Sequence, residues 1–183
     1  MHKIIITFTF LVCLFTRVYA QKGISVAELE KIITETNLEA EKLKDSLVKH
    51  QSDGYFNPAL AIEFGIDTFR IERIQERKMD LDYSTAGMLR ASYEGLAEYD
   101  KLLNKYYKTL LAKLNSEDKE KLKKTQRNWI EYRDSEIELI GIMSDDEYSG
   151  GGTIQRLVVA SRIQYFTKQR VITLFDYLVF TVN

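Results

Sequence analysis

Four charged side chains interrupt apolar stripes of the sequence, at positions that would lie inside a helical protein. They are Asp100 on one stripe, Arg133 and Glu136 on a second, and Arg170 on a third. Burial of an unpaired charge costs several kcal/mol, so such groups persist in a folded protein mainly as partners of one another. Asp100 and Glu136 could alternatively form a carboxylate pair for general acid and base catalysis, as in glycoside hydrolysis.

The arginines favour an ion-pair network over catalysis. A general acid needs a raised pKa, whereas a nearby guanidinium lowers the pKa of a carboxyl group. If the chain turns at Asn115 into an antiparallel helical hairpin, counting outward from the turn places Asp100 opposite Arg133. We therefore predict an interior ion pair between Asp100 and Arg133, which Glu136 and Arg170 extend into a single network.

The sequence offers few other residues for catalysis or metal binding. The chain has two histidines, His2 and His50, and one cysteine, Cys13. His2 and Cys13 fall in the first twenty residues, and His50 lies at the expected end of a helix. Zinc sites and Cys/His nucleophile pairs are thereby excluded from the rest of the chain. We predict no catalytic residues, no metal, no cofactor and no enzymatic activity.

Residues 144–153, SDDEYSGGGT, form the most distinctive loop in the sequence. No strand precedes Gly150, Gly151 and Gly152 and no lysine follows them, so they do not match a phosphate-binding loop. We interpret the segment as a flexible or tightly turned connection between helices. It is also the best candidate for a partner-binding loop, because Tyr148 offers an aromatic anchor and Ser149 a hydroxyl group.

The first twenty residues have the order of a secretory signal peptide. A basic start with Lys3 precedes an apolar run over residues 4–15, and Val18 and Ala20 stand at the minus three and minus one positions of a cleavage site. The apolar run is too short for a comfortable membrane span, and a retained membrane anchor is the less favoured alternative. We predict that residues 1–20 are removed and that the protein is periplasmic or secreted.

Processing would leave residues 21–183 with a nearly balanced charge and no cysteine. They hold 24 of the 26 basic side chains and all 27 acidic ones, a formal charge of −3. So slight an acidity predicts no binding to nucleic acid or to anionic membranes. Without disulfides the protein depends on a packed core, and one proline with abundant Leu, Glu, Lys and Ala predicts long helices.

Apolar residues at spacings of three and four predict an all-α protein, a bundle of about five helices. Residues 24–51 carry a heptad seam, which indicates a helix that packs along another helix. Its members are Val26, Leu29, Ile33, Thr36, Ala40, Leu43 and Leu47. After a break at residues 52–54, residues 58–78 are ambiguous, because three apolar residues near their start alternate as in a strand while the later ones favour a helix.

Two longer helices are expected over residues 85–114 and from about residue 116 to 143, and a last helix over residues 154–180. On the first, the inward positions are Leu89, Tyr93, Leu96, Leu103, Tyr107, Leu110 and Leu114. On the second, they are Leu122, Gln126, Trp129, Arg133, Glu136, Ile140 and Met143. No internal repeat and no long linker divides the chain into independent domains.

Two blocks of sequence resemble the paired signature of the lysozyme-inhibitor LprI-like domain family. The blocks are YDKLLNKYYKTLLAKL, from residue 99 to 114, and LKKTQRNWIEYRDSE, from residue 122 to 136. The matching residues are Asp100, Leu103, Asn104 and Tyr106 in the first block, and Gln126, Arg127, Trp129, Arg133, Asp134 and Glu136 in the second. The three glycines with Thr153, and Thr167 followed by Arg170, look like the family's closing segment.

The resemblance extends over roughly residues 83–178. With the signal peptide expected at 1–20, the resemblance divides the rest of the chain into an N-terminal helical extension at 21–81 and an LprI-like helical domain at 82–183. Family members usually carry cysteines near the positions of Ala91, Ile137 and Arg162. Loss of all of them together is what we expect if they are disulfide partners in the family.

The family takes its name from a member that inhibits lysozyme. The resemblance therefore implies a non-catalytic protein of the bacterial envelope whose partner is lysozyme or another envelope protein. The alternative is a structural or adaptor helical protein of the periplasm or cell envelope without lysozyme inhibition. The residues leave both interpretations open.

Overall fold

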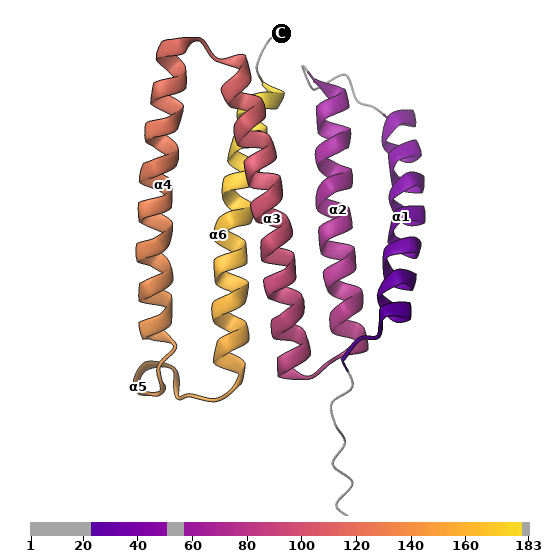
Figure 1. Ribbon diagram of the computed structural model, residues 1–183, viewed down its shortest axis with the longest axis vertical. Coiled ribbons are helices and arrows are strands. Elements are labelled where there is room, and N and C mark those ends of the chain that lie inside the picture. The colour runs from indigo at the N-terminus through magenta and orange to yellow at the C-terminus, as the bar shows by residue number, and fades with distance from the viewer. Residues whose placement is uncertain (1–22, 51–56, 181–183) are drawn as a thin grey trace, which may run out of the picture.

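The computed structural model describes residues 23–50 and 57–180, and five long helices make up most of these two stretches (Figure 1). The helices are α1 (Val26–Lys49), α2 (Pro58–Leu81), α3 (Thr85–Lys113), α4 (Ser116–Met143) and α6 (Ile154–Val179), with the single turn α5 (Asp146–Ser149) between the last two. The prediction of an all-α bundle of about five helices is confirmed. The predicted signal peptide, residues 1–20, and the predicted break at residues 52–54 lie outside the described residues.

Side-chain caps fix where the first two helices begin. The Ser25 hydroxyl accepts a hydrogen bond from the backbone N–H of Glu28, and the Glu28 carboxylate accepts one from the backbone N–H of Ser25. This capping box starts α1. Asn57 caps α2, where Pro58 takes the first helical position. The segment with ambiguous periodicity is therefore helical throughout.

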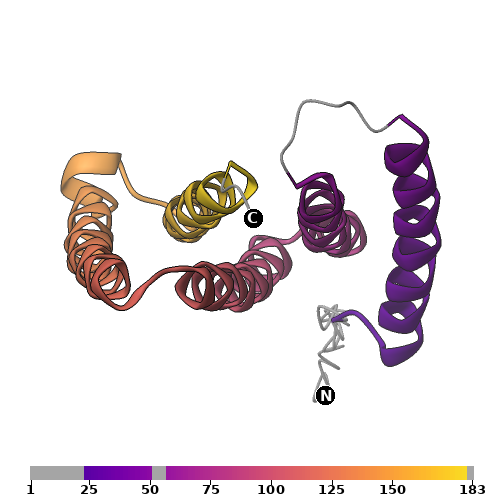
Figure 2. The same ribbon diagram turned by 90° about the horizontal axis from the view of Figure 1, so that it is seen from above.

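Seen from above, the helices form an open row in which α2, α3, α4 and α6 are viewed nearly end-on and α1 is tilted relative to them (Figure 2). Helices α3 and α6 occupy the middle of the row, α4 stands at one end, and α2 separates the central pair from α1 at the other end. None of the described helices has an apolar stretch long enough to cross a membrane.

The core lies between α3 and α6, which run parallel to one another and make the most extensive helix contact of the molecule (Figure 1). The largest fully buried side chains of the core are Tyr99 and Tyr106 on α3 and Val171, Leu174, Leu178 and Val179 on α6. Phe64 of α2 joins this core by stacking on Phe175, with ring centroids 4.0 Å apart. Burial of apolar surface stabilises a protein by about 25 cal/mol per Å², so the contact between these two helices is a major source of stabilisation.

Polar bonds attach α2 to the central pair. The Glu72 carboxylate of α2 accepts hydrogen bonds from the Tyr99 hydroxyl, at 2.7 Å, and from the Lys168 ammonium. The side-chain amides of Gln75 and Gln164 bond to each other in both directions, at 3.0 and 2.6 Å. These bonds satisfy polar groups that would otherwise be costly to bury between the helices.

Helix α1 packs along α2, as its heptad pattern predicts. Its buried residues are Ile32, Thr36 and Ala40, and ion pairs of 2.7 Å from Arg77 to Glu35 and to Glu39 flank them. The predicted seam is wrong in its first half, because Ile32 is buried whereas Ile33 is 40% exposed. The contact follows residues four apart, which is the commonest ridge by which helices pack.

The buried face of α3 also differs from the predicted stripe. Tyr93 is half exposed, whereas Tyr99 and Tyr106 are fully buried. The prediction followed the large aliphatic residues along one face. Helix α3 lies between two helices, however, and it buries a wider surface that includes small residues, among them Ala91 and Gly95.

Gly95 provides a test of this close packing. A Cβ atom at Gly95 would lie 2.3 Å from Gln75 Oε1 and 2.9 Å from Gln164 Nε2. We expect Gly95→Ala to disrupt the reciprocal amide bonds and to lower the free energy of unfolding by about 1 to 3 kcal/mol. In the matched control Gly141→Ala, where the new Cβ meets nothing within 4 Å, stability should be unchanged or raised by about 0.5 to 1 kcal/mol. Equal effects of the two changes, measured by urea unfolding, would contradict the packing.

Candidate functional site

Helix α4 stands against α6, and its contacts with α3 are few. The predicted hairpin, in which α4 packs along α3 as its nearest neighbour in sequence, is therefore wrong. Helix α6 instead occupies the place beside α3, because its apolar surface is larger and includes Leu174 and Leu178. On α4 only Leu122 and Ile140 are buried. Within residues 82–183, the edge formed by α4 is thus the least tightly packed part.

The predicted ion pair between Asp100 and Arg133 is also wrong. The Arg133 guanidinium bonds to the neighbouring Asp134 carboxylate, with Nη2 and Oδ1 2.7 Å apart. It also lies over the Trp129 ring, 5.2 Å from the ring centroid. In the described part of the chain, no ion pair joins Asp100 to either Arg133 or Arg170. Arg133 is near enough for its charge to act on Asp100, as the hairpin count expected, but the few contacts between α3 and α4 do not bring the two groups into an ion pair.

Asp100 instead remains a half-buried carboxyl group on α3. Burial raises its pKa above the ordinary value, and the positive charge of Arg133 opposes this shift only in part. The family residue Asn104 lies one turn further along and donates a hydrogen bond to the Asp100 backbone carbonyl. The groove lined by Glu136 does not include Asp100, so the two carboxyl groups are not brought together as a catalytic pair.

Arg170 is the most deeply buried charge of the motif, with 7% of its surface exposed. Its Nε donates a hydrogen bond to Gln126 Oε1 at 3.0 Å, and its guanidinium lies 5.9 Å from the Trp129 ring centroid. Its Nη2 has no hydrogen-bond partner, and burial lowers the pKa of the guanidinium. The structure therefore brings Gln126, Trp129, Arg133 and Arg170 together, as a cation–aromatic cluster that fastens α4 to α6.

Two of the remaining family residues lie outside this cluster. Glu136 lines the groove between α4 and α6 and forms no ion pair with Arg170 among the described residues. Arg127 is exposed on α4. The predicted network of two acids and two bases does not form. Arg133 and Arg170 instead gather near Trp129, and neither Asp100 nor Glu136 forms an ion pair with them.

The segment after α4 is a folded tip. Within it, α5 is a single helical turn, and Ser149 Oγ donates a hydrogen bond to the Ser144 carbonyl at 2.9 Å. The three glycines that follow all have left-handed backbone angles, with φ of 76°, 78° and 98°. Other residue types rarely adopt such angles. A Cβ at Gly151 would also lie 2.5 Å from Asp146 Oδ1. The sequence predicted a connection that is either flexible or tightly turned, and the structure shows a tight turn.

The tip displays the residues that the sequence singled out. Tyr148 is 56% exposed, and Asp145, Asp146 and Glu147 are exposed around it. Figure 1 places α5 at one end of the molecule, beyond the ends of α4 and α6. Three features missing from the sequence analysis are Arg162 in the groove, the exposed apolar residues near it, and the contact of Asp146 with Gly151. Arg162 and its apolar neighbours are visible in the sequence as a charge within an apolar run.

Within the described ranges, no group of three or more His, Cys, Asp or Glu side chains could hold a metal ion. The electropositive cluster and the acidic tip are therefore the two chemically distinctive features of the region from α3 to α6. The cluster is mostly covered by α4 and α6, whereas the tip is open to a partner.

Asp100 carries a test of the corrected site. Because its pKa is raised in the folded protein, the charged form destabilises the fold at neutral pH, and this effect disappears below the ordinary value of 3.8. We expect Asp100→Asn to raise the free energy of unfolding at neutral pH and to lose this advantage as the pH falls below that value. The exposed residue change Asp80→Asn is the control and should have little effect at either pH. A loss of stability in Asp100→Asn at neutral pH would instead support a buried ion pair.

Comparison with protein-family models matches residues 76–174 to the family described as lysozyme inhibitor LprI. No curated protein and no solved structure matches the chain significantly. The matched segment runs from the end of α2 to the second half of α6 and includes the cation–aromatic cluster, Asp100 and the tip. It covers more than half of the chain, and the protein is therefore a member of the lysozyme inhibitor LprI family.

Proposed function

We propose that this protein is an exported, non-catalytic inhibitor that binds a lysozyme through the tip formed by α5 and the three glycines. The observation that carries the proposal is the combination of family membership with an exposed tyrosine in an acidic, rigid turn at the end of the molecule. Export is supported by the signal-peptide pattern of residues 1–20.

The shape of the tip suits a cleft better than a helix face does. A lysozyme binds a sugar chain in a long cleft, and a broad helical surface cannot enter such a cleft. The tip consists of a four-residue turn and three glycines without side chains, so its backbone can approach a surface closely. Tyr148 stands on this turn, where it can fill a pocket as an aromatic anchor.

The charge of the tip suits a basic partner. Asp145, Asp146 and Glu147 are consecutive and exposed, and lysozymes of the animal type are basic. Complementary charges of this kind mainly increase the association rate, and salt screens them. Asp146 has a second role, because its carboxylate occupies the space beside Gly151 and so helps to define the turn.

The cation–aromatic cluster supports the tip from within. Arg170 bonds to Gln126, and the guanidinium groups of Arg133 and Arg170 both lie near the Trp129 ring. These contacts orient α4 on α6, and the tip joins the ends of these two helices. In this proposal the motif residues position the binding element and do not themselves contact the enzyme.

The proposal is tested with purified protein in a turbidity assay of cell-wall lysis by a panel of basic lysozymes. We expect inhibition at micromolar concentration, and we expect Tyr148→Ala to weaken it by roughly 30-fold, which corresponds to about 2 kcal/mol for an aromatic anchor. The paired change Asp145→Lys and Glu147→Lys should slow association and remove its salt dependence.

Tyr83→Ala is the matched control, since Tyr83 is an exposed tyrosine outside the tip, and it should leave inhibition unchanged. If the wild type inhibits and Tyr148→Ala does not weaken the inhibition, the function stands but the contact with the enzyme lies outside the tip. Absence of inhibition across the panel would reject the inhibitor and favour the alternative, an adaptor of the cell envelope.

A further inference from the structure

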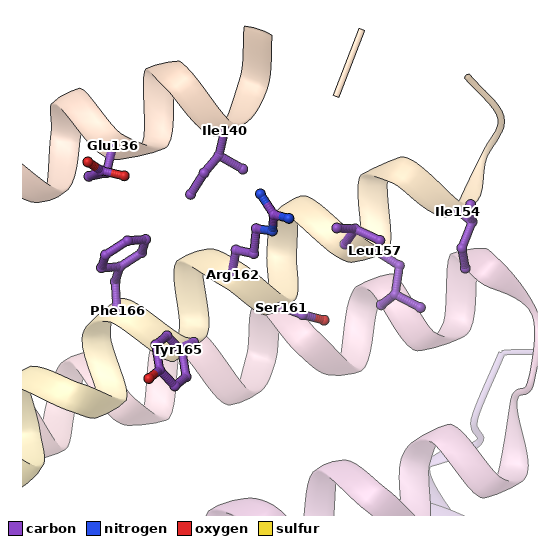
Figure 3. A pocket seen from close by; sticks show the side chains of 9 residues that line it. Glu136, Ile140, Ile154, Leu157, Ser161, Arg162, Tyr165 and Phe166 are labelled. Atoms are coloured by element: carbon purple, nitrogen blue, oxygen red, sulfur yellow. The ribbon is translucent and has the colours of Figure 1, made fainter. Parts of the chain in front are cut away.

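A groove of about 630 Å³ runs between α4 and α6 near the tip, lined by 9 residues (Figure 3). Glu136 and Ile140 form its wall on α4, and the other labelled side chains, including Tyr165 and Phe166, come from α6. The only charged side chains among the nine are Glu136 and Arg162. The lining is therefore mostly apolar and carries one charge of each sign.

Large apolar side chains of both helices are exposed in this region, with exposed fractions between 37% and 59%. Ile154, Val158 and Tyr165 of α6 line the groove itself. On α4 the exposed apolar residues are Tyr132, Leu139 and Met143. Exposed apolar residues that gather in this way mark interaction sites in soluble proteins.

Helix α4 is incompletely packed for its length. It has 28 residues, of which only Leu122 and Ile140 are buried. Helices in proteins are stabilised chiefly by burial of an apolar face, and the open side of α4 leaves part of that face uncovered. The antiparallel pair of α4 and α6 therefore resembles one half of a four-helix bundle, with the groove in the place of the missing half.

The charges of Glu136 and Arg162 bear on which partner could cover the groove. Glu136 and Arg162 stand on opposite walls, and neither forms an ion pair with another described residue. We propose that a second copy of this chain covers the groove, related by a twofold axis. A twofold interface pairs each residue with its counterpart in both directions, so Glu136 of each copy would meet Arg162 of the partner subunit, and the two apolar linings would close into one core.

A basic enzyme is a poorer fit to this surface. Its complement would be a surface with excess negative charge, as at the tip, whereas the charges of the groove are balanced. The exposed tip residues Tyr148 and Asp145 do not line the groove, so dimerisation leaves them free to bind a target. The inference is thus independent of the proposed inhibition.

Sedimentation equilibrium of the purified protein tests the dimer. We expect the wild type to sediment at twice the mass of one chain at micromolar concentration, within the affinity range of interfaces of standard size. Tyr165→Glu places a charge in the proposed interface and should weaken dimerisation by about tenfold or more. Tyr93→Glu is the matched control on the exposed surface of α3 and should leave it unchanged. A wild type that sediments as a monomer would overturn the proposal. This holds even if adding a lysozyme protects the groove residues, because the groove would then bind the enzyme and not a second copy.

A charge-swap cycle distinguishes a self-complementary interface from a general loss of apolar contact. Glu136→Arg and Arg162→Glu should each weaken the dimer by about tenfold, because each places like charges opposite one another. The double variant should recover wild-type affinity to within about threefold. Weakening in the double variant equal to the sum of the two single effects, or no effect of either, would place the interface elsewhere.

Discussion

The parallel packing of α3 against α6 is the interaction on which the rest of the structure depends. Tyr99 and Tyr106 of α3 and Leu174 and Leu178 of α6 are almost completely buried in it. Every other long helix is attached to this pair or to a neighbour of it. Helix α2 joins it through Glu72 and the stacked ring of Phe64, α1 joins α2, and α4 joins α6. Because parallel neighbours cannot be joined by a short turn, the chain passes through α4 and the tip before it returns along α6.

This connection explains the contrast between the two edges of the central pair. The edge at α2 is closed by hydrogen bonds and small residues, among them Gly95, and α1 covers it further. The edge at α4 is held by two buried aliphatic residues and by Trp129 with its two arginines. A lone buried cation such as Arg170 adds little net stability, so the cluster sets the position of α4 more than it stabilises the fold. The tip and the open groove both lie on this edge.

The sequence predicted where the helices lie along the chain better than it predicted which helices pack against each other. Helices over residues 24–51, 85–114 and 154–180 followed from the spacing of apolar residues, and the signature residues correctly indicated the family. The partner of α4 could not be predicted, because sequence adjacency favours α3 while the competition among apolar faces is decided in three dimensions. The same error produced the incorrect ion pair of Asp100. The stripe on α3 was led through Tyr93 for another reason, because small buried residues such as Ala91 and Gly95 give no strong apolar signal. The tip residues Tyr148 and Gly150 were singled out because a glycine run beside an aromatic residue is a local signal, and their role in binding stays a prediction.

The account holds that the α3–α6 pair is a fixed support and that the tip at the end of the α4 edge meets the target enzyme. Hydrogen–deuterium exchange with and without a saturating amount of a lysozyme that the protein inhibits tests this most directly. The account predicts slow exchange in the facing parts of α3 and α6 in both states, with added protection on binding confined to residues 144–153 and the adjoining end of α4. Protection that appears on α1 and α2, with the tip unchanged, would contradict it.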